Sequence, residues 1–214
     1  MTDVSSIPTY VINLPERVDR LKHIKNEFKD RDEFELTIVE ACKHEVGAVG
    51  LWNSILKVVD IAFNKDQDVF IICEDDHKFT QHYTKEFLFE NIEEAYEKGA
   101  DILLGGVGGC TYAMPVAKNR FWIEHFICTQ FTVLYRDFFP AIKSEHFDIH
   151  NTADGKFSSM TIDKMVIFPF ISVQKEFGYS DITKDINRPP ITGIFESTSI
   201  FFDRIQKIYS FYNS

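Results

Sequence analysis

The sequence predicts an α/β fold in which an open, mixed and mainly parallel sheet carries helices on both faces. Strand-like and helix-like segments alternate as β-α-β-α-β over the first third of the chain. Apolar residues recur at intervals of two in the expected strands and at helical intervals between them. Neither an internal repeat nor a linker divides the 214 residues, so we expect a single domain over residues 1–214.

Each element follows from a local pattern. Residues 9–13 form a short apolar run, and Pro15 then stands where the first turn of a helix tolerates proline. The polar cluster at residues 64–68 ends a second helix. The expected elements are a strand at 9–13, a helix with Val18, Leu21, Ile24 and Phe28, a strand with Phe34, Leu36 and Ile38, a helix with Trp52, Ile55, Leu56, Val59 and Phe63, a strand at 69–73, a helix at 87–96, and strands at 101–104, 126–135 and 166–171.

The C-terminal segment carries an apolar stripe at helical spacing, with few cations beside it. Membrane-surface helices are usually rich in Lys and Arg, so we expect this helix to dock on the core of the protein. The stripe consists of Phe201, Ile205, Ile208, Tyr209 and Tyr212.

Composition narrows the class of protein. Lys and Arg number 23 against 33 Asp and Glu, a formal net charge of -10, which argues against nucleic acid as a partner because phosphate neutralisation needs clustered cations. The four cysteines form no C-x-x-C pair and are typical of reduced thiols in a cytoplasmic protein. We find no signal-peptide pattern and no long apolar run, so we expect a cytoplasmic protein whose contact with the inner face of the membrane is at most peripheral.

An acid triplet follows the most apolar strand. Residues 69–76 read Val-Phe-Ile-Ile-Cys-Glu-Asp-Asp, so Glu74, Asp75 and Asp76 are adjacent. Three neighbouring carboxylates repel one another unless water or a cation screens them. In an extended segment Glu74 and Asp76 would share one side, and carboxylate oxygens suit Mg²⁺ or Mn²⁺. A solvated acidic turn is the alternative interpretation.

Other motifs give weaker signals. Residues 105–109 (Gly-Gly-Val-Gly-Gly) lack the third glycine of a dinucleotide fingerprint, because Thr111 stands in its place, and we expect a flexible loop beside the pocket. His77 adjoins the acids, but packing or surface exposure is the more usual role of such a histidine. A metal at a strand end suits chemistry on a diphosphate, which includes both glycosyl transfer and phosphoester hydrolysis. Hydrolysis would need a second acid cluster, and none is evident.

Several segments occur in an informative order. Residues 10–14 read Tyr-Val-Ile-Asn-Leu and precede Arg17, Asp19 and Arg20. Residues 49–54 read Val-Gly-Leu-Trp-Asn-Ser, and residues 70–76 end in the acids. Four further segments follow in the order 129–135, Asp154, Val173-Gln174 and Ser180-Asp181-Ile182. Together they resemble glycosyltransferase family 25, which includes lipooligosaccharide and collagen galactosyltransferases. The resemblance covers most of the chain.

The resemblance implies a GT-A fold and an inverting, metal-dependent transfer of a sugar such as galactose. The donor would be a nucleotide sugar, here a UDP-sugar, and the acceptor a cell-surface glycan or lipid-linked oligosaccharide such as lipopolysaccharide. By position, Asp76 and Glu74 would hold Mn²⁺ or Mg²⁺, Glu74 would also face the ribose, and Asp75 would hydrogen-bond the transferred sugar. The nucleotide would lie near Asn13, Arg17 and Ser54.

The reaction also needs a base on the acceptor hydroxyl, and Asp154 is the candidate. A turn-forming role for Asp154 is the alternative, in which case the base would be sought among Asp163, Asp181 and Asp185. Ile55 stands where the family has His, and Leu51 replaces its Cys. These departures keep open a second hypothesis, a degenerate member of the family that binds a glycan or protein without catalysis.

Overall fold

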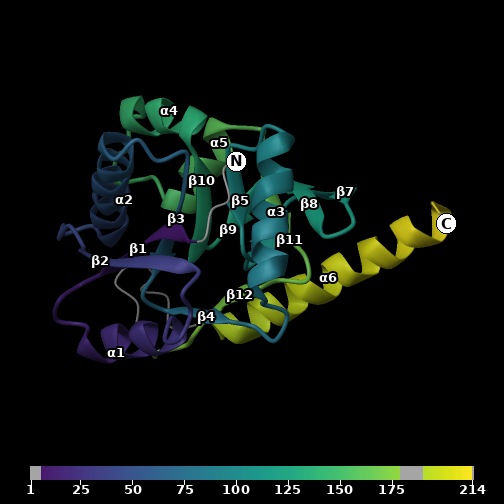
Figure 1. Cartoon of the computed structure of the whole chain (residues 1–214), viewed down its shortest axis with the longest axis horizontal. Coiled ribbons are helices and arrows are strands. Elements are labelled where there is room, and N and C mark those ends of the chain that lie inside the picture. Colours follow the sequence, from purple (N-terminus) through teal and green to yellow (C-terminus); the bar gives the residue numbers. More distant parts are fainter. Residues whose placement is uncertain (1–5, 179–189, 214) are drawn as a thin grey trace.

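The computed structural model of the chain describes residues 6–178 and 190–213. Its centre is a sheet whose strands lie in the order β2 (Phe34–Glu40), β1 (Ile7–Asn13), β3 (Val69–Glu74), β10 (Phe131–Tyr135), β5 (Ile102–Leu104), β11 (Lys164–Ile167), β8 (Arg120–Ile123) and β7 (Ala113–Ala117) (Figure 1). Pairing makes β10 and β8 run against the other strands of this sheet. The prediction of an open, mixed, mainly parallel sheet is therefore confirmed.

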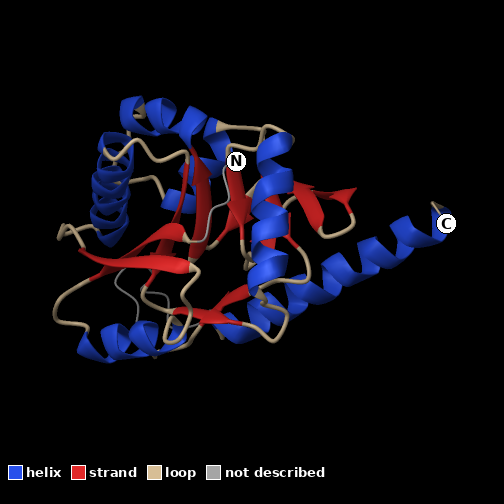
Figure 2. Ribbon diagram, viewed as in Figure 1, coloured by secondary structure: helices blue, strands red, loops and turns tan. Residues whose placement is uncertain are grey.

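Helices cover both faces of the sheet (Figure 2). On one face lie α1 (Val18–Glu27) and α3 (Lys85–Glu97); on the other lie α2 (Gly47–Asn64), α4 (Phe139–Ser144), α5 (Ala153–Met160) and the first turns of α6 (Ile191–Tyr212). Strand β3 serves both cores: Phe70 and Ile72 pack toward α2, and Ile71 and Cys73 pack toward α1 and α3. This alternation explains why β3 reads as a continuous apolar run.

The first half of the fold agrees with the sequence. The expected β-α-β-α-β order is present as β1, α1, β2, α2 and β3, and all three strands are parallel neighbours. Consequently the carboxyl ends of β1, β2 and β3 lie at one edge of the sheet, where ligands bind in open α/β folds. The expected helix at 87–96 and strand at 101–104 correspond to α3 and β5.

The second half differs from the sequence-based expectation. The strand expected at 126–135 is two strands, because Cys128 adopts a left-handed backbone with φ of 80° and interrupts the ladder. Its first part, β9 (Phe126–Ile127), pairs with β6 (Gly109–Cys110) in a separate small sheet. The strand expected at 166–171 ends at Ile167, two residues before Pro169, which has no N–H to donate. A further small sheet joins β4 (His77–Phe79) to β12 (Ser172–Gln174).

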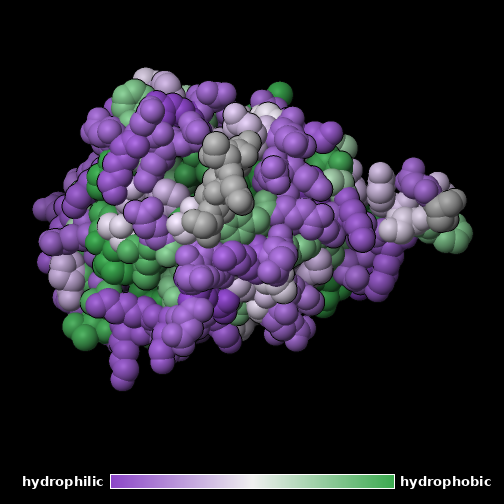
Figure 3. Space-filling view, in the orientation of Figure 1, coloured by the Kyte–Doolittle hydropathy of each residue, from purple (hydrophilic) through white to green (hydrophobic). Residues whose placement is uncertain are grey.

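Helix α6 docks mainly by residues that the sequence analysis did not select, although Ile205 of the expected stripe also packs against the core. Ile191, Phe195 and Phe202 are buried in the core, whereas Phe201 and Ile208 of the expected stripe are 44% and 60% exposed. The C-terminal half of α6 extends away from the rest of the molecule (Figure 1), and hydrophobic residues are visible at its far end (Figure 3). No helix in the described residues is long and apolar enough to cross a membrane.

Candidate functional site

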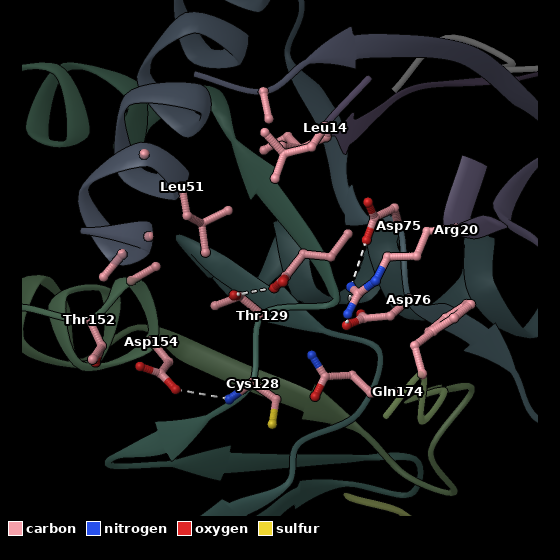
Figure 4. A pocket seen from close by; sticks show the side chains of 18 of the residues that line it. Leu14, Arg20, Leu51, Asp75, Asp76, Cys128, Thr129, Thr152, Asp154 and Gln174 are labelled. Atoms are coloured by element: carbon pink, nitrogen blue, oxygen red, sulfur yellow. Dashed lines mark hydrogen bonds and ion pairs between the residues drawn. The ribbon is translucent and has the colours of Figure 1, made fainter. Parts of the chain in front are cut away.

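A cleft of about 640 Å³ opens at the carboxyl ends of β1, β2 and β3. Its volume lies within the range of roughly 300–1,000 Å³ that is usual for small-molecule sites. The acid triplet and Arg20 form one side, and Asp154 with Thr152 at the start of α5 forms the other (Figure 4). Thr129 and Cys128 lie between them (Figure 4).

Each carboxylate of the triplet is held by a different set of donors. Glu74 accepts the Thr129 hydroxyl at 2.6 Å. Asp75 accepts Asn13 Nδ2 at 2.8 Å on one oxygen and Arg20 Nη1 at 2.9 Å on the other. The same Arg20 nitrogen lies 3.1 Å from Asp76 Oδ2. The strict alternation expected from an extended segment stops at Glu74, because Asp75 and Asp76 form a turn between β3 and β4.

Burial raises the pKa values of two of these acids, Glu74 and Asp76. Burial raises the pKa of Glu74 from 4.5 to about 8; the Asp76 charge adds to the rise, and the Thr129 hydrogen bond opposes it. Burial also raises the pKa of Asp76, from 3.8 to about 6, although Arg20 lowers it. The Arg20 guanidinium therefore does not offset the cost of burying the charges of Glu74 and Asp76.

The described residues contain no group of three His, Cys, Asp or Glu side chains that could enclose a metal ion. Asp76 Oδ1 is nevertheless buried and has no hydrogen-bond partner. A buried carboxylate oxygen without a donor fits a cation, and Mg²⁺ commonly binds through one or two carboxylates together with substrate phosphates. The acids therefore fit a metal that arrives with a diphosphate rather than a metal held by protein alone.

Asp154 faces the acids from the opposite side of the cleft. Thr152 caps α5 by accepting the Gly155 N–H at 3.2 Å, which places Asp154 in the first turn of the helix. Its Oδ2 accepts the backbone N–H of Cys128 at 3.0 Å. The left-handed conformation of Cys128, uncommon for a residue with a Cβ, aims this N–H at Asp154 while Thr129 reaches Glu74. One irregular segment thus fixes an acid on each side of the cleft.

Three residues expected near a nucleotide lie in different surroundings. Asn13 is buried beside Asp75 and orients that carboxylate. Ser54 is fully buried, accepts the Cys42 N–H at 2.8 Å and donates to the Gly50 carbonyl at 2.7 Å, so it supports the cleft loop from behind. Arg17 is the N-cap of α1 and is absent from the cleft lining, whereas Arg20, one turn later, enters it.

The wall after β12 contributes residues to which the sequence analysis gave no role. Lys175 and Arg20 lie on the Phe177 ring, at 4.8 and 4.9 Å from its centroid, and all three line the cleft. The Lys175 N–H donates to the Asp76 carbonyl at 2.7 Å, which ties this wall to the acid turn. Lys175 and Phe177 come directly after the Val173-Gln174 segment, and this was the one hint in the sequence that they lie near the site. Sequence spacing does not indicate which distant residue a side chain contacts.

The packing role expected for a histidine such as His77 is confirmed, and the flexible loop expected at residues 105–109 is corrected. His77 is fully buried, bonded through Nδ1 to Ser172 Oγ at 2.8 Å, and packed among phenylalanines, so it is not at the cleft. The glycines at 105–108 are also buried and do not line the cleft. A Cβ on Gly106 would lie 2.1 Å from the Ser172 carbonyl oxygen, so the glycine permits close packing rather than a flexible loop.

Of the three acids named as alternatives to Asp154, the structure describes Asp163. Asp163 is exposed, precedes β11 and does not line the cleft. Asp181 and Asp185, together with the Ser180-Asp181-Ile182 segment, lie outside the described residues. Asp154 is therefore the candidate that the structure brings to the cleft opposite the triplet.

Comparison with known proteins gives a fold but no family. No protein-family model matches the chain, and no curated protein resembles it in sequence. The structure of A197 from STIV matches with a TM-score of 0.52 and 16% identity, over 80% of this chain and 86% of that one. UDP-glucose pyrophosphorylase complexed with UDP-glucose matches with a TM-score of 0.50 and 10% identity, over 92% and 81%. The chain therefore shares an α/β fold with a nucleotide-sugar enzyme.

The buried acids predict a distinctive pH dependence of stability in the absence of metal. Because the folded-state pKa of Glu74 exceeds its unfolded value, the folded protein binds more protons between about pH 4.5 and 8. Glu74 therefore contributes a fall in the free energy of unfolding as pH rises through that window, by on the order of a few kcal/mol, whereas the lowered pKa values of His77 and His23 contribute a rise in its acid part. Urea unfolding in EDTA at several pH values measures this slope.

Glu74→Gln should flatten the slope, since glutamine keeps an acceptor for Thr129 and carries no titrating proton. Glu45→Gln is the matched control, because it removes an exposed carboxylate from the same cleft. An equal slope in the parent and in Glu74→Gln would show that Glu74 is not the group that titrates.

Proposed function

We propose that this chain is a metal-dependent, inverting glycosyltransferase that moves a sugar from a UDP-sugar to a glycan acceptor. The proposal depends on one observation: two acids with different surroundings line the same cleft. Asp76 Oδ1 is a buried carboxylate oxygen without a hydrogen-bond donor, and Asp154 lies on the other side. The likeness in fold to UDP-glucose pyrophosphorylase supports a nucleotide-sugar ligand, and the resemblance to glycosyltransferase family 25 supports the reaction class.

In this proposal the two sides of the cleft act on different substrates. Asp76 would hold Mn²⁺ or Mg²⁺, which when bound neutralises the diphosphate as it becomes the leaving group. Glu74 and Asp75 lie on the same side and would contact the donor ribose and sugar. Thr129, Asn13 and Arg20 hold these carboxylates in place before any ligand binds. Such preorganisation lowers the cost of ordering the site around the donor.

Asp154 would act on the acceptor. The acceptor hydroxyl oxygen forms the new bond to the anomeric carbon as the bond to the diphosphate oxygen breaks, and the hydroxyl proton passes to Asp154. The Cys128 N–H keeps the carboxylate turned toward the cleft. Attack from the side opposite the leaving group inverts the anomeric carbon, and it requires the base and the metal side to face one another, as Asp154 and Asp76 do (Figure 4).

A non-catalytic glycan- or protein-binding role is the second candidate. It is favoured by Arg20, whose guanidinium already bridges Asp75 and Asp76. A protein of this kind would keep the buried ion pairs for structure alone and would have no use for a divalent cation.

Metal-dependent donor binding separates the two candidates. A UDP-sugar with Mn²⁺ should raise the melting temperature by several degrees, since a ligand at 100 times its Kd adds about 2.7 kcal/mol to the stability. Mn²⁺ or the UDP-sugar alone should have a much smaller effect. Asp76→Asn should abolish the combined shift and leave the ligand-free protein folded. The matched control is Asp68→Asn, which changes an exposed acid before the opposite end of β3. Binding of the donor that persists unchanged in Asp76→Asn would remove the metal role.

Asp154→Asn should slow turnover by roughly 10²- to 10⁴-fold, the usual contribution of a positioned base, with little change in donor affinity. Asparagine can still accept the Cys128 N–H with its one oxygen and loses only the acceptor that Oδ1 offers to the Gly155 N–H at 2.8 Å, which Thr152 also accepts, so the fold around the cleft should survive. Asp148→Asn, in the exposed loop before α5, is the control. Turnover is measured as release of UDP with a panel of glycan acceptors. Near-normal turnover of the Asp154 variant would return that residue to a purely structural role.

A further inference from the structure

The projecting half of α6 presents large apolar side chains to solvent. Phe201, Ile208 and Tyr209 are 44%, 60% and 43% exposed, and Phe211 and Tyr212 are 75% and 79% exposed. A cluster of this kind on a helix that leaves the body of the molecule is a candidate interaction surface. It lies apart from the proposed catalytic role and does not depend on it.

Spacing indicates what kind of partner the helix fits. Phe201, Ile205, Ile208 and Tyr212 follow one another at intervals of four, three and four residues. Apolar residues recur at these intervals in coiled coils, where the side chains at positions a and d of each heptad insert between side chains of a facing helix. The stripe therefore has the repeat that packs against another α-helix.

Charge disfavours a lipid surface as the partner. Lys207 is engaged by Asp203, one turn earlier, at 2.6 Å, so Arg204 is the projecting half's one cation without an ion pair among the described residues. The whole chain carries a formal net charge of -10, which anionic headgroups repel. Helices that lie on membranes usually carry many more Lys and Arg residues on the polar face.

We infer that α6 pairs with α6 of a second copy of this chain, antiparallel, about a two-fold axis near Gln206 and Lys207. In that register Phe201 faces Tyr212 of the partner subunit. Ile208 faces the part of Ile205 of the partner subunit that the partner's own core leaves uncovered, since Ile205 is only partly buried against that core. Both layers obey the a-to-d pairing of antiparallel coiled coils. The two-fold axis makes each layer occur twice, and the contact closes on itself as a dimer.

The flanking positions fit the same register. Arg204 lies beside the stripe on one flank and is placed opposite Phe211 of the partner subunit, where a guanidinium can stack on an aromatic ring. An antiparallel pair also keeps the two acidic bodies at opposite ends of the helix pair, which limits their repulsion.

The area is sufficient for a specific dimer. Four aromatic side chains that are 43–79% exposed offer on the order of 500 Å² per copy, taking about 200 Å² for a whole aromatic side chain. Ile205 and Ile208 add to this. A standard interface buries about 800 Å² on each partner, so the seam supplies most of the area of an ordinary, reversible dimer.

Sedimentation velocity of the full chain, from about 1 to 100 µM, tests the inference in the micromolar range expected for such an interface. The parent should sediment as a dimer of the 24.9 kDa chain at the higher concentrations. Ile208→Glu should shift the species to monomer, because it places a charge in the centre of the seam twice. Ser210→Glu adds the same charge on the opposite face of the helix and should leave the dimer intact.

Two controls keep the result interpretable. Ile208 is 60% exposed, so the melting temperature of Ile208→Glu should stay close to that of a monomeric parent at low concentration. A parent that is monomeric throughout the range overturns the inference, and so does a dimer that Ile208→Glu leaves intact. A monomer that instead cosediments with phosphatidylglycerol vesicles through Ile208 would assign the stripe to a lipid surface.

Discussion

The arrangement of this protein depends on holding three adjacent carboxylates at the end of a buried strand. Their mutual repulsion is offset by donors from separate parts of the chain: Asn13 after β1, Arg20 in α1 and Thr129 before β10. Because β1 and β10 are the two neighbours of β3, the acids can be satisfied only when both pairings are formed. The donors that stabilise the carboxylates are therefore in place only when β1, β3 and β10 have paired in this order.

A second constraint is the interruption at Cys128. If residues 126–135 formed one continuous strand, their N–H groups would be used in the ladder, and Asp154 would lose the donor that reaches it from Cys128 and keep only the Gly155 N–H of its own helix. The left-handed turn at Cys128 releases that N–H and sends β9 into a separate sheet with β6. A Cβ on Gly108 would lie 2.7 Å from Cys128 Sγ, so the glycine makes room for the turn. The irregular backbone is what gives the cleft two chemically different sides.

Sequence patterns predicted the parts of this fold that are encoded locally. Apolar periodicity identified β1 to β3 with their helices, and three adjacent acids after an apolar run indicated the cleft. The same patterns could not choose between Arg17 and Arg20, since one helical turn separates them and only tertiary packing decides which enters the site. The break at Cys128 was missed because nothing in a β-favouring run marks a left-handed cysteine. Helix α6 has more apolar residues than the core buries, and they lie on more than one face. Periodicity alone therefore could not identify the face that docks.

Charge also couples the binding of the two ligands in the proposed reaction. A donor diphosphate is an anion, and the side of the cleft that would receive it carries three carboxylates and a single arginine that already bridges two of them. Lys175 adds a positive charge to the lining of the cleft, where its ammonium group lies against the Phe177 ring. The diphosphate therefore gains little from approaching the acids alone, and the divalent cation gains little from a site that offers it one carboxylate oxygen without a hydrogen-bond donor. Each supplies what the other lacks, so the two ligands should bind with strong mutual dependence. Asp154, on the far side, is left outside this balance and is available to the acceptor.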